Sequence, residues 1–190
     1  MNNPTRPLRH VWPLLPVVLS VLTGCTVAQF EMASSNFTAQ EARAQSSACK
    51  RAVYARPEFA PLLPHLPDPV TGQFSSVQMT DETRPTAEEV ALFASWFDAT
   101  VGCNHTYIVA AHSVRPDVAA ILDNWQTAQS QIATQVVERR ITWAEFARQW
   151  QHLLSEANAQ ITASSQRWMA EKNAENQAEL RGGKLAPENH

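Results

Sequence analysis

The chain has 190 residues, with 15 Lys and Arg residues against 18 Asp and Glu residues and a net charge of −3. This length suffices for one domain. A mildly acidic chain lacks the basic surface that nucleic-acid binding needs, so no nucleic-acid partner is expected. Charge alone gives it no attraction to anionic lipid either.

Residues 1–24 have the three parts of a secretion signal. Two positive charges, Arg6 and Arg9, precede an almost wholly apolar run over residues 11–22, and small residues follow that run. The run is shorter than the roughly 20 residues that span a bilayer as a helix. We therefore expect a cleaved signal peptide over residues 1–24 rather than a membrane helix.

The signal ends in Leu22-Thr23-Gly24-Cys25, which resembles the lipobox of bacterial lipoproteins. In that family the Cys sulfur receives diacylglycerol, a peptidase cuts before it, and the new amine is usually acylated. The resemblance covers residues 1–25 alone and implies lipidation of Cys25, which would anchor the protein to a membrane of the cell envelope. Thr26 stands where inner-membrane lipoproteins of enteric bacteria carry Asp. The resemblance therefore implies the outer membrane, with the protein expected to face the periplasm and the cell surface as the alternative. The alternative is an ordinary secretion signal in which Cys25 occurs by chance.

Two further cysteines, Cys49 and Cys103, remain for the mature chain. An even pair in an exported protein predicts a disulfide. Closing that loop would stabilise the fold by about 4 kcal/mol on the chain-entropy model. The alternative is two separate buried thiols. Neither Cys belongs to a C-x-x-C motif, which disfavours metal or redox chemistry, and we expect no cofactor.

The mature chain is predicted to be all-α, a small helical bundle of about four helices with a long Pro-rich connection and a polar helical C-terminal tail. Glycine is sparse, and alternating runs of β-branched residues are missing. The expected organisation is a lipidated Cys and tether over 25–37, a helical domain over 38–168 that contains the Pro-rich loop 56–85, and a polar tail over 169–190. The end of that tail, 184–190, is expected to be disordered.

Helices are expected over about 28–55 and 86–111, from Pro116, and from Thr142. Apolar residues recur at steps of three and four along each of the last two. Capping boxes are predicted at Thr38-x-x-Glu41, Thr86-x-x-Glu89 and Thr142-x-x-Glu145. Gly102 is expected to break or bend the second helix.

The connection over residues 56–85 is dense in proline, which forbids a long helix and favours extended polyproline-like backbone. It also carries apolar residues that predict packing across the bundle, namely Phe59, Leu62, Leu63, Leu66 and Phe74.

Two places are candidates for partner binding. Pro64 and His65 lie in a proline-flanked stretch that could be offered to a partner; the alternative is a loop that wraps the core. Trp168 stands where the apolar stripe of the last helix ends, so it either caps the core or belongs to an exposed patch.

Asp98, His105 and His112 are spaced by seven residues on one predicted helix. Ligands seven apart lie about 10 Å apart along an unbroken helix and cannot share one metal ion. We therefore predict no metal site, and we name no catalytic residue.

The expected function is that of a non-catalytic binding or scaffolding lipoprotein with an unidentified envelope protein partner. Phosphate-binding loops, nucleotide fingerprints and the H-E-x-x-H motif are missing, so an enzyme is not expected. One alternative is a small-ligand or metal-binding protein, or a hydrolase, that uses Asp98, His105 and His112. Another is a structural spacer between membrane and cell wall, with the polar tail as its arm.

Overall fold

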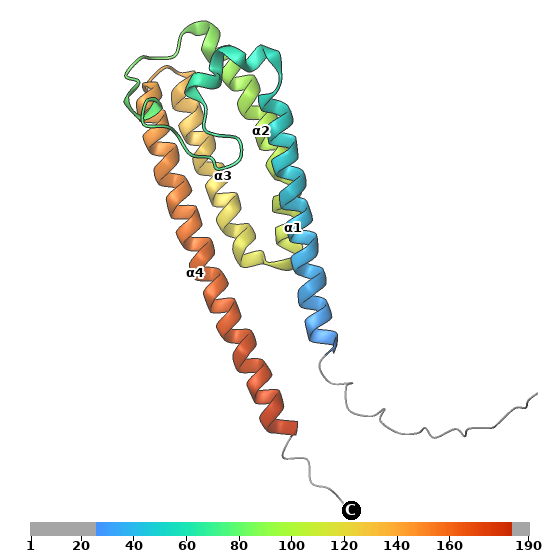
Figure 1. Ribbon diagram of the computed structural model, residues 1–190. Coiled ribbons are helices and arrows are strands. Elements are labelled where there is room, and N and C mark those ends of the chain that lie inside the picture. The colour runs from blue at the N-terminus through green and yellow to red at the C-terminus, as the bar shows by residue number, and fades with distance from the viewer. Residues whose placement is uncertain (1–25, 184–190) are drawn as a thin grey trace, which may run out of the picture. The chain divides into compact units, whose positions relative to one another are not determined.

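The computed structural model describes residues 26–183, with side chains described over 40–181. The chain divides into two compact units, Met1–Ser34 and Ser35–His190, and the core, the disulfide and the cavity all belong to the second. Every regular element in the described part is a helix, which confirms the all-α class (Figure 1). The elements are α1 (Thr26–Tyr54), η1 (Pro57–His65), η2 (Gln78–Thr80), α2 (Ala87–Val114), α3 (Pro116–Val137) and α4 (Trp143–Gly183), where η denotes a 3₁₀ helix. Over this range no helix has an apolar stretch of the length that crossing a membrane requires.

Two of the predicted capping boxes start helices. The Thr86 hydroxyl accepts a hydrogen bond from the amide of Glu89 at 3.2 Å, and the Glu89 carboxylate accepts one from the amide of Thr86 at 2.8 Å. Thr142 and Glu145 make the same pair of bonds at 3.2 and 2.7 Å. These bonds satisfy amides that the first turn of a helix leaves free.

Two sequence expectations about the helices, a start at Thr38 and a break at Gly102, are wrong. Thr38 lies inside α1, which already begins at Thr26, so Thr38 and Glu41 do not start a helix. Gly102 does not break α2, which continues to Val114. A helical Gly costs only about 1 kcal/mol relative to Ala, and the packing of the residues on either side of it outweighs that cost. At the C-terminus the predicted helical tail continues α4 to Gly183, and residues 184–190 lie outside the described range.

The Pro-rich connection is a 3₁₀ helix over Pro57–His65, not the extended polyproline backbone expected there. The φ angle that the proline ring imposes falls within the range of a 3₁₀ helix. Side chains three residues apart lie on one face of such a helix. Phe59 and Leu62 are therefore buried together, at 1% and 0% exposure, whereas Leu63 is exposed. The prediction that this connection packs across the bundle is confirmed.

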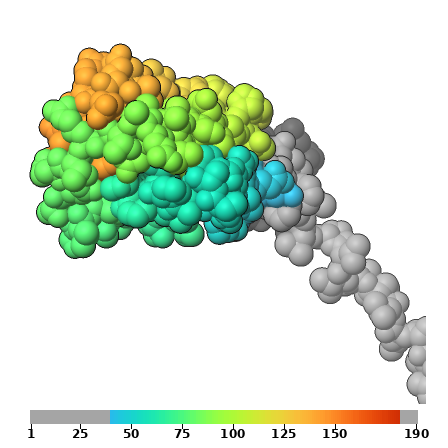
Figure 2. Space-filling view, turned by 90° about the horizontal axis from the view of Figure 1, so that it is seen from above, coloured from blue at the N-terminus to red at the C-terminus, as the bar shows by residue number. Residues whose placement is uncertain are grey.

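The rest of the connection holds the start of α4. The amide of Trp143 donates to the carbonyl of Thr83 at 2.9 Å, and the amide of Ala144 donates to the carbonyl of Asp81 at 2.7 Å. Both amides belong to the first turn, which has no partner within the helix. In Figure 2 the green residues of this segment and of the start of α2 lie directly beside the orange first turns of α4.

The buried side chains form two clusters. The larger one contains Phe93, Trp96, Trp143, Phe146 and Trp150, whose rings contact one another, together with η1 and parts of α3. The smaller one, around Ile108, Ala119 and Leu122, lies near the junction of α2 and α3. The core of the bundle is thus divided into two parts.

The predicted disulfide is present and joins α1 to α2 through Cys49 and Cys103, with 5.5 Å between the two Cα atoms. Cys103 is buried at 4% exposure, whereas Cys49 lies at the surface. The bond therefore fixes α1 against α2 next to the larger core cluster.

Candidate functional site: a cavity between the helices

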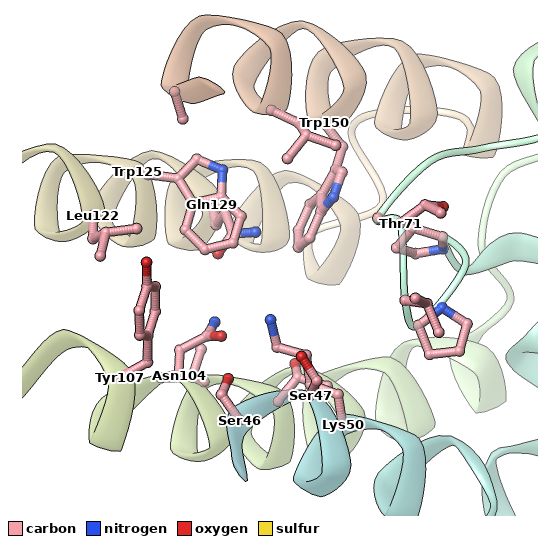
Figure 3. A pocket seen from close by; sticks show the side chains of 18 of the residues that line it. Ser46, Ser47, Lys50, Thr71, Asn104, Tyr107, Leu122, Trp125, Gln129 and Trp150 are labelled. Atoms are coloured by element: carbon pink, nitrogen blue, oxygen red, sulfur yellow. The ribbon is translucent and has the colours of Figure 1, made fainter. Parts of the chain in front are cut away.

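A cavity of about 440 Å³ lies between α1 and α2 on one side and α3 and α4 on the other (Figure 3). This volume falls within the range of small-molecule sites, about 300–1,000 Å³. Its lining includes Trp96 and Trp150 from the larger core cluster and Ile108 and Leu122 from the smaller one. The cavity therefore lies where the apolar core is interrupted.

Two buried amide side chains point into this space from opposite walls. Asn104 on α2 is 6% exposed, Gln129 on α3 is 3% exposed, and both reach toward the gap in Figure 3. Neither side-chain amide forms a hydrogen bond with another residue that the structure describes. Their amide atoms are not among the fully buried atoms that lack a partner, so they are reached from the cavity. These two amides are therefore available to a molecule inside the cavity.

Lys50 extends from α1 into the same space (Figure 3). Burial lowers the pKa of its ammonium group, and the nearby charge of Arg43 lowers it further. Within the described residues no carboxylate offsets this charge. The centroid of the Trp125 ring lies 6.0 Å from Lys50 Nζ, at the limit of a cation–π contact.

Aromatic rings form much of the wall. Trp125 and Trp150 lie edge to face with their centroids 6.5 Å apart, and Tyr54 meets Trp96 in the same way at 5.7 Å. The indole nitrogens of Trp96 and Trp125 are buried without a hydrogen-bond partner in the part of the chain that is described. Burial raises the pKa of the Tyr54 phenol above its usual range, and the charge of Asp68 adds to that effect. Tyr54 is therefore a neutral phenol at ordinary pH.

A tight turn over Asp68–Gly72 closes one side of the cavity. The carboxylate of Asp68 accepts hydrogen bonds from the amides of Val70 and Thr71 at 2.9 and 2.7 Å and from the Thr71 hydroxyl at 2.9 Å. These bonds lower the pKa of Asp68. Gly72 has a φ of +70°, and a Cβ there would come 3.3 Å from Leu154 Cδ2. Asp68 is thus used within the turn, and only Gly fits the end of the turn without strain.

His65, a predicted partner-binding residue, ties the Pro-rich connection to the bundle. Its ring stacks on Trp143 with the centroids 4.5 Å apart. Nδ1 lies 3.0 Å from Asp81 Oδ2, and Nε2 lies 3.5 Å from Glu89 Oε1. These contacts favour the alternative of a loop that wraps the core. Pro64 beside it is exposed.

Trp168 is half-buried and lies under the guanidinium of Arg115, whose Cζ is 5.2 Å from the ring centroid. Arg115 also pairs with Asp117 at 2.7 Å and donates to the Ser164 hydroxyl at 3.0 Å. Trp168 therefore belongs to a contact between α4 and the α2–α3 junction.

Asp98, His105 and His112 all lie exposed on one continuous helix. His112 Nε2 is 2.9 Å from Asp123 Oδ2 on α3, a surface contact. Among the side chains that the structure describes, over 40–181, no three His, Cys, Asp or Glu residues are grouped to hold a metal ion. The geometry thus gives the alternative of a metal or hydrolase site here no support. The predicted lipidation of Cys25 and the signal over 1–24 lie outside the described residues.

Sequence reasoning missed the cavity and also one Ser-x-x-Lys spacing, Ser47 to Lys50, on its wall. This spacing occurs in serine hydrolases that use Ser and Lys together. Ser47 lies in the middle of α1, where helical hydrogen bonds occupy the backbone amides. No hydrogen bond links the two side chains in the described structure. Ser47 and Lys50 therefore have no free backbone amides beside them that could stabilise an oxyanion.

No protein-family model, curated protein or solved structure matches this chain.

Proposed function

We propose that this chain is a non-catalytic binding protein of the bacterial cell envelope, with the interhelical cavity as its site for a small molecule. The observation that carries the proposal is the cavity itself, on whose wall the buried indole nitrogens of Trp96 and Trp125 lack a hydrogen-bond partner among the described residues. Folded proteins rarely leave buried donors such as these indole nitrogens unsatisfied, and those that do so usually need an explanation from function or from bound water. A bound molecule supplies that explanation.

The chemistry of the lining supports binding rather than catalysis. The residues around the cavity include no His, Cys or Glu, and Asp68 is engaged in its own turn. The remaining groups are aromatic rings, aliphatic side chains, amides, hydroxyls and two cations. Such groups hold and orient a ligand, whereas acid–base chemistry at neutral pH calls for a group with a matched pKa.

The proposed location rests on the resemblance of residues 1–25 to lipoproteins. Lipid on Cys25 would hold the binding domain at the outer membrane, because two or three acyl chains anchor a protein stably. Mass spectrometry of the mature N-terminus is expected to show a lipid-modified Cys25, and a Cys25→Ala variant should no longer fractionate with membranes. Membrane association that is unchanged in Cys25→Ala would contradict this part of the proposal.

The cavity is tested with N-phenyl-1-naphthylamine, a neutral aromatic probe whose fluorescence rises in apolar surroundings. Ser47→Trp places a bulky ring into the cavity from α1, whereas the adjacent Ala48 is exposed and lies outside the lining. We expect the parent and Ala48→Trp to bind the probe alike and Ser47→Trp to bind it about tenfold more weakly or not at all. Equal binding by all three chains, or binding by none, would rule out the cavity as the site.

A spacer or scaffold role is the second candidate, favoured by the length of α4. This helix has 41 residues, about 60 Å at the standard rise, and nearly every side chain from Met169 to Arg181 is exposed. Removing residues 169–190 should then abolish crosslinking to an envelope partner while probe binding stays unchanged. If the truncated chain still captures the same partner, this candidate fails.

A further inference from the structure

We propose that the ligand of this cavity is an amphipathic organic anion, with its acidic group on Lys50 and its apolar body against the aromatic wall. This inference rests on the proposed binding function and adds the chemical class of the ligand. Three features of the lining lead to it: the balance of charges, the nature of the hydrogen-bonding groups, and the aromatic rings that lie opposite the cations of α1.

The charges around the cavity favour a negative ligand. Arg43 and Lys50 are its cationic residues, and Asp68 is its acidic residue. Asp68 is exposed and already accepts three hydrogen bonds within its turn. Lys50 is largely desolvated and has no carboxylate partner among the described residues, an arrangement that is costly without a counter-ion. An anion placed at Lys50 removes that cost.

The hydrogen-bonding groups point the same way. The indoles of Trp96 and Trp125 are donors only, and so is the ammonium of Lys50. Asn104 and Gln129 each offer two further donor hydrogens from their amide groups. A carboxylate, sulfonate or phosphate brings acceptors alone and so complements this set. Bonds from such donors to a charged acceptor are roughly twice as strong as neutral ones.

The lining offers both polar and apolar groups, and its cationic side chains, those of Arg43 and Lys50, come from α1. Ser46, Ser47, Lys50 and Asn104 reach into the cavity from the side of α1 and α2, whereas Leu122, Trp125 and Trp150 face them from α3 and α4 (Figure 3). Ile161 and Leu154 extend the apolar side along α4. A ligand with one charged end and a flat or aliphatic body matches a lining whose cations come from α1 and whose aromatic rings include Trp125 and Trp150.

The test compares two probes that share one aromatic skeleton. 8-Anilinonaphthalene-1-sulfonate carries an anionic sulfonate, and N-phenyl-1-naphthylamine does not. Both are titrated into the full-length chain, exchanged from detergent into an amphipathic polymer, and the same is done for Lys50→Met and Arg51→Met. Arg51 is the matched control because it is the next residue on α1, is exposed and does not line the cavity.

We expect the parent to bind the anionic probe about tenfold or more tightly than the neutral one, as one charged hydrogen bond in a buried site implies. Lys50→Met should lose about tenfold in affinity for the anionic probe and less than about twofold for the neutral probe. Arg51→Met should match the parent. Lys50→Met is expected to fold because it removes a desolvated charge, and its thermal melt checks this.

The outcomes separate the two proposals. If the neutral probe binds in the cavity but the anionic probe binds no better, or if Lys50→Met weakens both probes equally, the ligand class is wrong while the binding function stands. If neither probe binds, the proposed function falls and the ligand class falls with it.

Discussion

The disulfide between α1 and α2 gives a prediction whose size follows from the structure. Cys49 and Cys103 are 54 residues apart, and the chain-entropy model gives about 4 kcal/mol for a closed loop of that length. For a domain of this size, each kcal/mol shifts the melting temperature by about 2–4 °C. A Cys49→Ala, Cys103→Ala double variant should therefore melt about 8–16 °C below the oxidised parent.

Circular dichroism at 222 nm during heating measures this shift, with and without a phosphine reductant. The reductant should lower the melting temperature of the parent toward that of the double variant and leave the double variant unaffected. Because α1 carries Lys50 and Ser47, its release should also weaken binding of N-phenyl-1-naphthylamine. If the double variant melts within about 2 °C of the oxidised parent, the argument that the bond restrains the unfolded chain is refuted.

Three further predictions concern single side chains. Phe93 is fully buried among aromatic rings. Phe93→Ala should lower the protein's free energy of unfolding, measured by urea denaturation, by about 3–5 kcal/mol. Thr142→Ala removes the N-cap of α4 and should cost about 1 kcal/mol by the same method; a change of zero would show that the bonds from the Pro-rich connection suffice. Hydrogen bonds from Arg115, aided by Ser164, hold the pKa of Asp117 well below its usual range. Stability from this carboxylate is complete above about pH 4 and is lost as the pH falls further, so urea midpoints between pH 5 and 2 should fall less in Asp117→Asn than in the parent.

Much of the fold could be predicted because its signals are local. The Thr and Glu of a capping box lie one turn apart, so Thr86 with Glu89 and Thr142 with Glu145 reveal two helix starts directly. The pairing of Cys49 with Cys103 followed from there being two cysteines left to pair. The 3₁₀ helix of the connection was missed because proline fits both backbones, and only the burial of Phe59 and Leu62 decides between them.

The cavity could not be predicted because its parts come from separate helices. Lys50, Asn104 and Gln129 lie on α1, α2 and α3, and each is an unremarkable polar residue in its own segment. The one available signal was that Gln129 interrupts the spacing of the apolar stripe on its helix. Its meaning depends on what α1 and α2 place opposite, which is a property of the assembled bundle. Trp125 likewise has the spacing of a core residue, and only the assembled bundle shows that it lines the cavity.

The turn over Asp68–Gly72 has a consequence for how fast a ligand enters and leaves the cavity. Its shape is maintained by hydrogen bonds within the turn, and Val70 at its tip is 69% exposed. The helices around the cavity are held by a covalent bond and by packed rings, so the turn is the part of the wall that can swing aside with the least disruption. Residence time would then depend on this short segment, while equilibrium occupancy depends on the helices. Substitutions at its tip would change association and dissociation rates by the same factor.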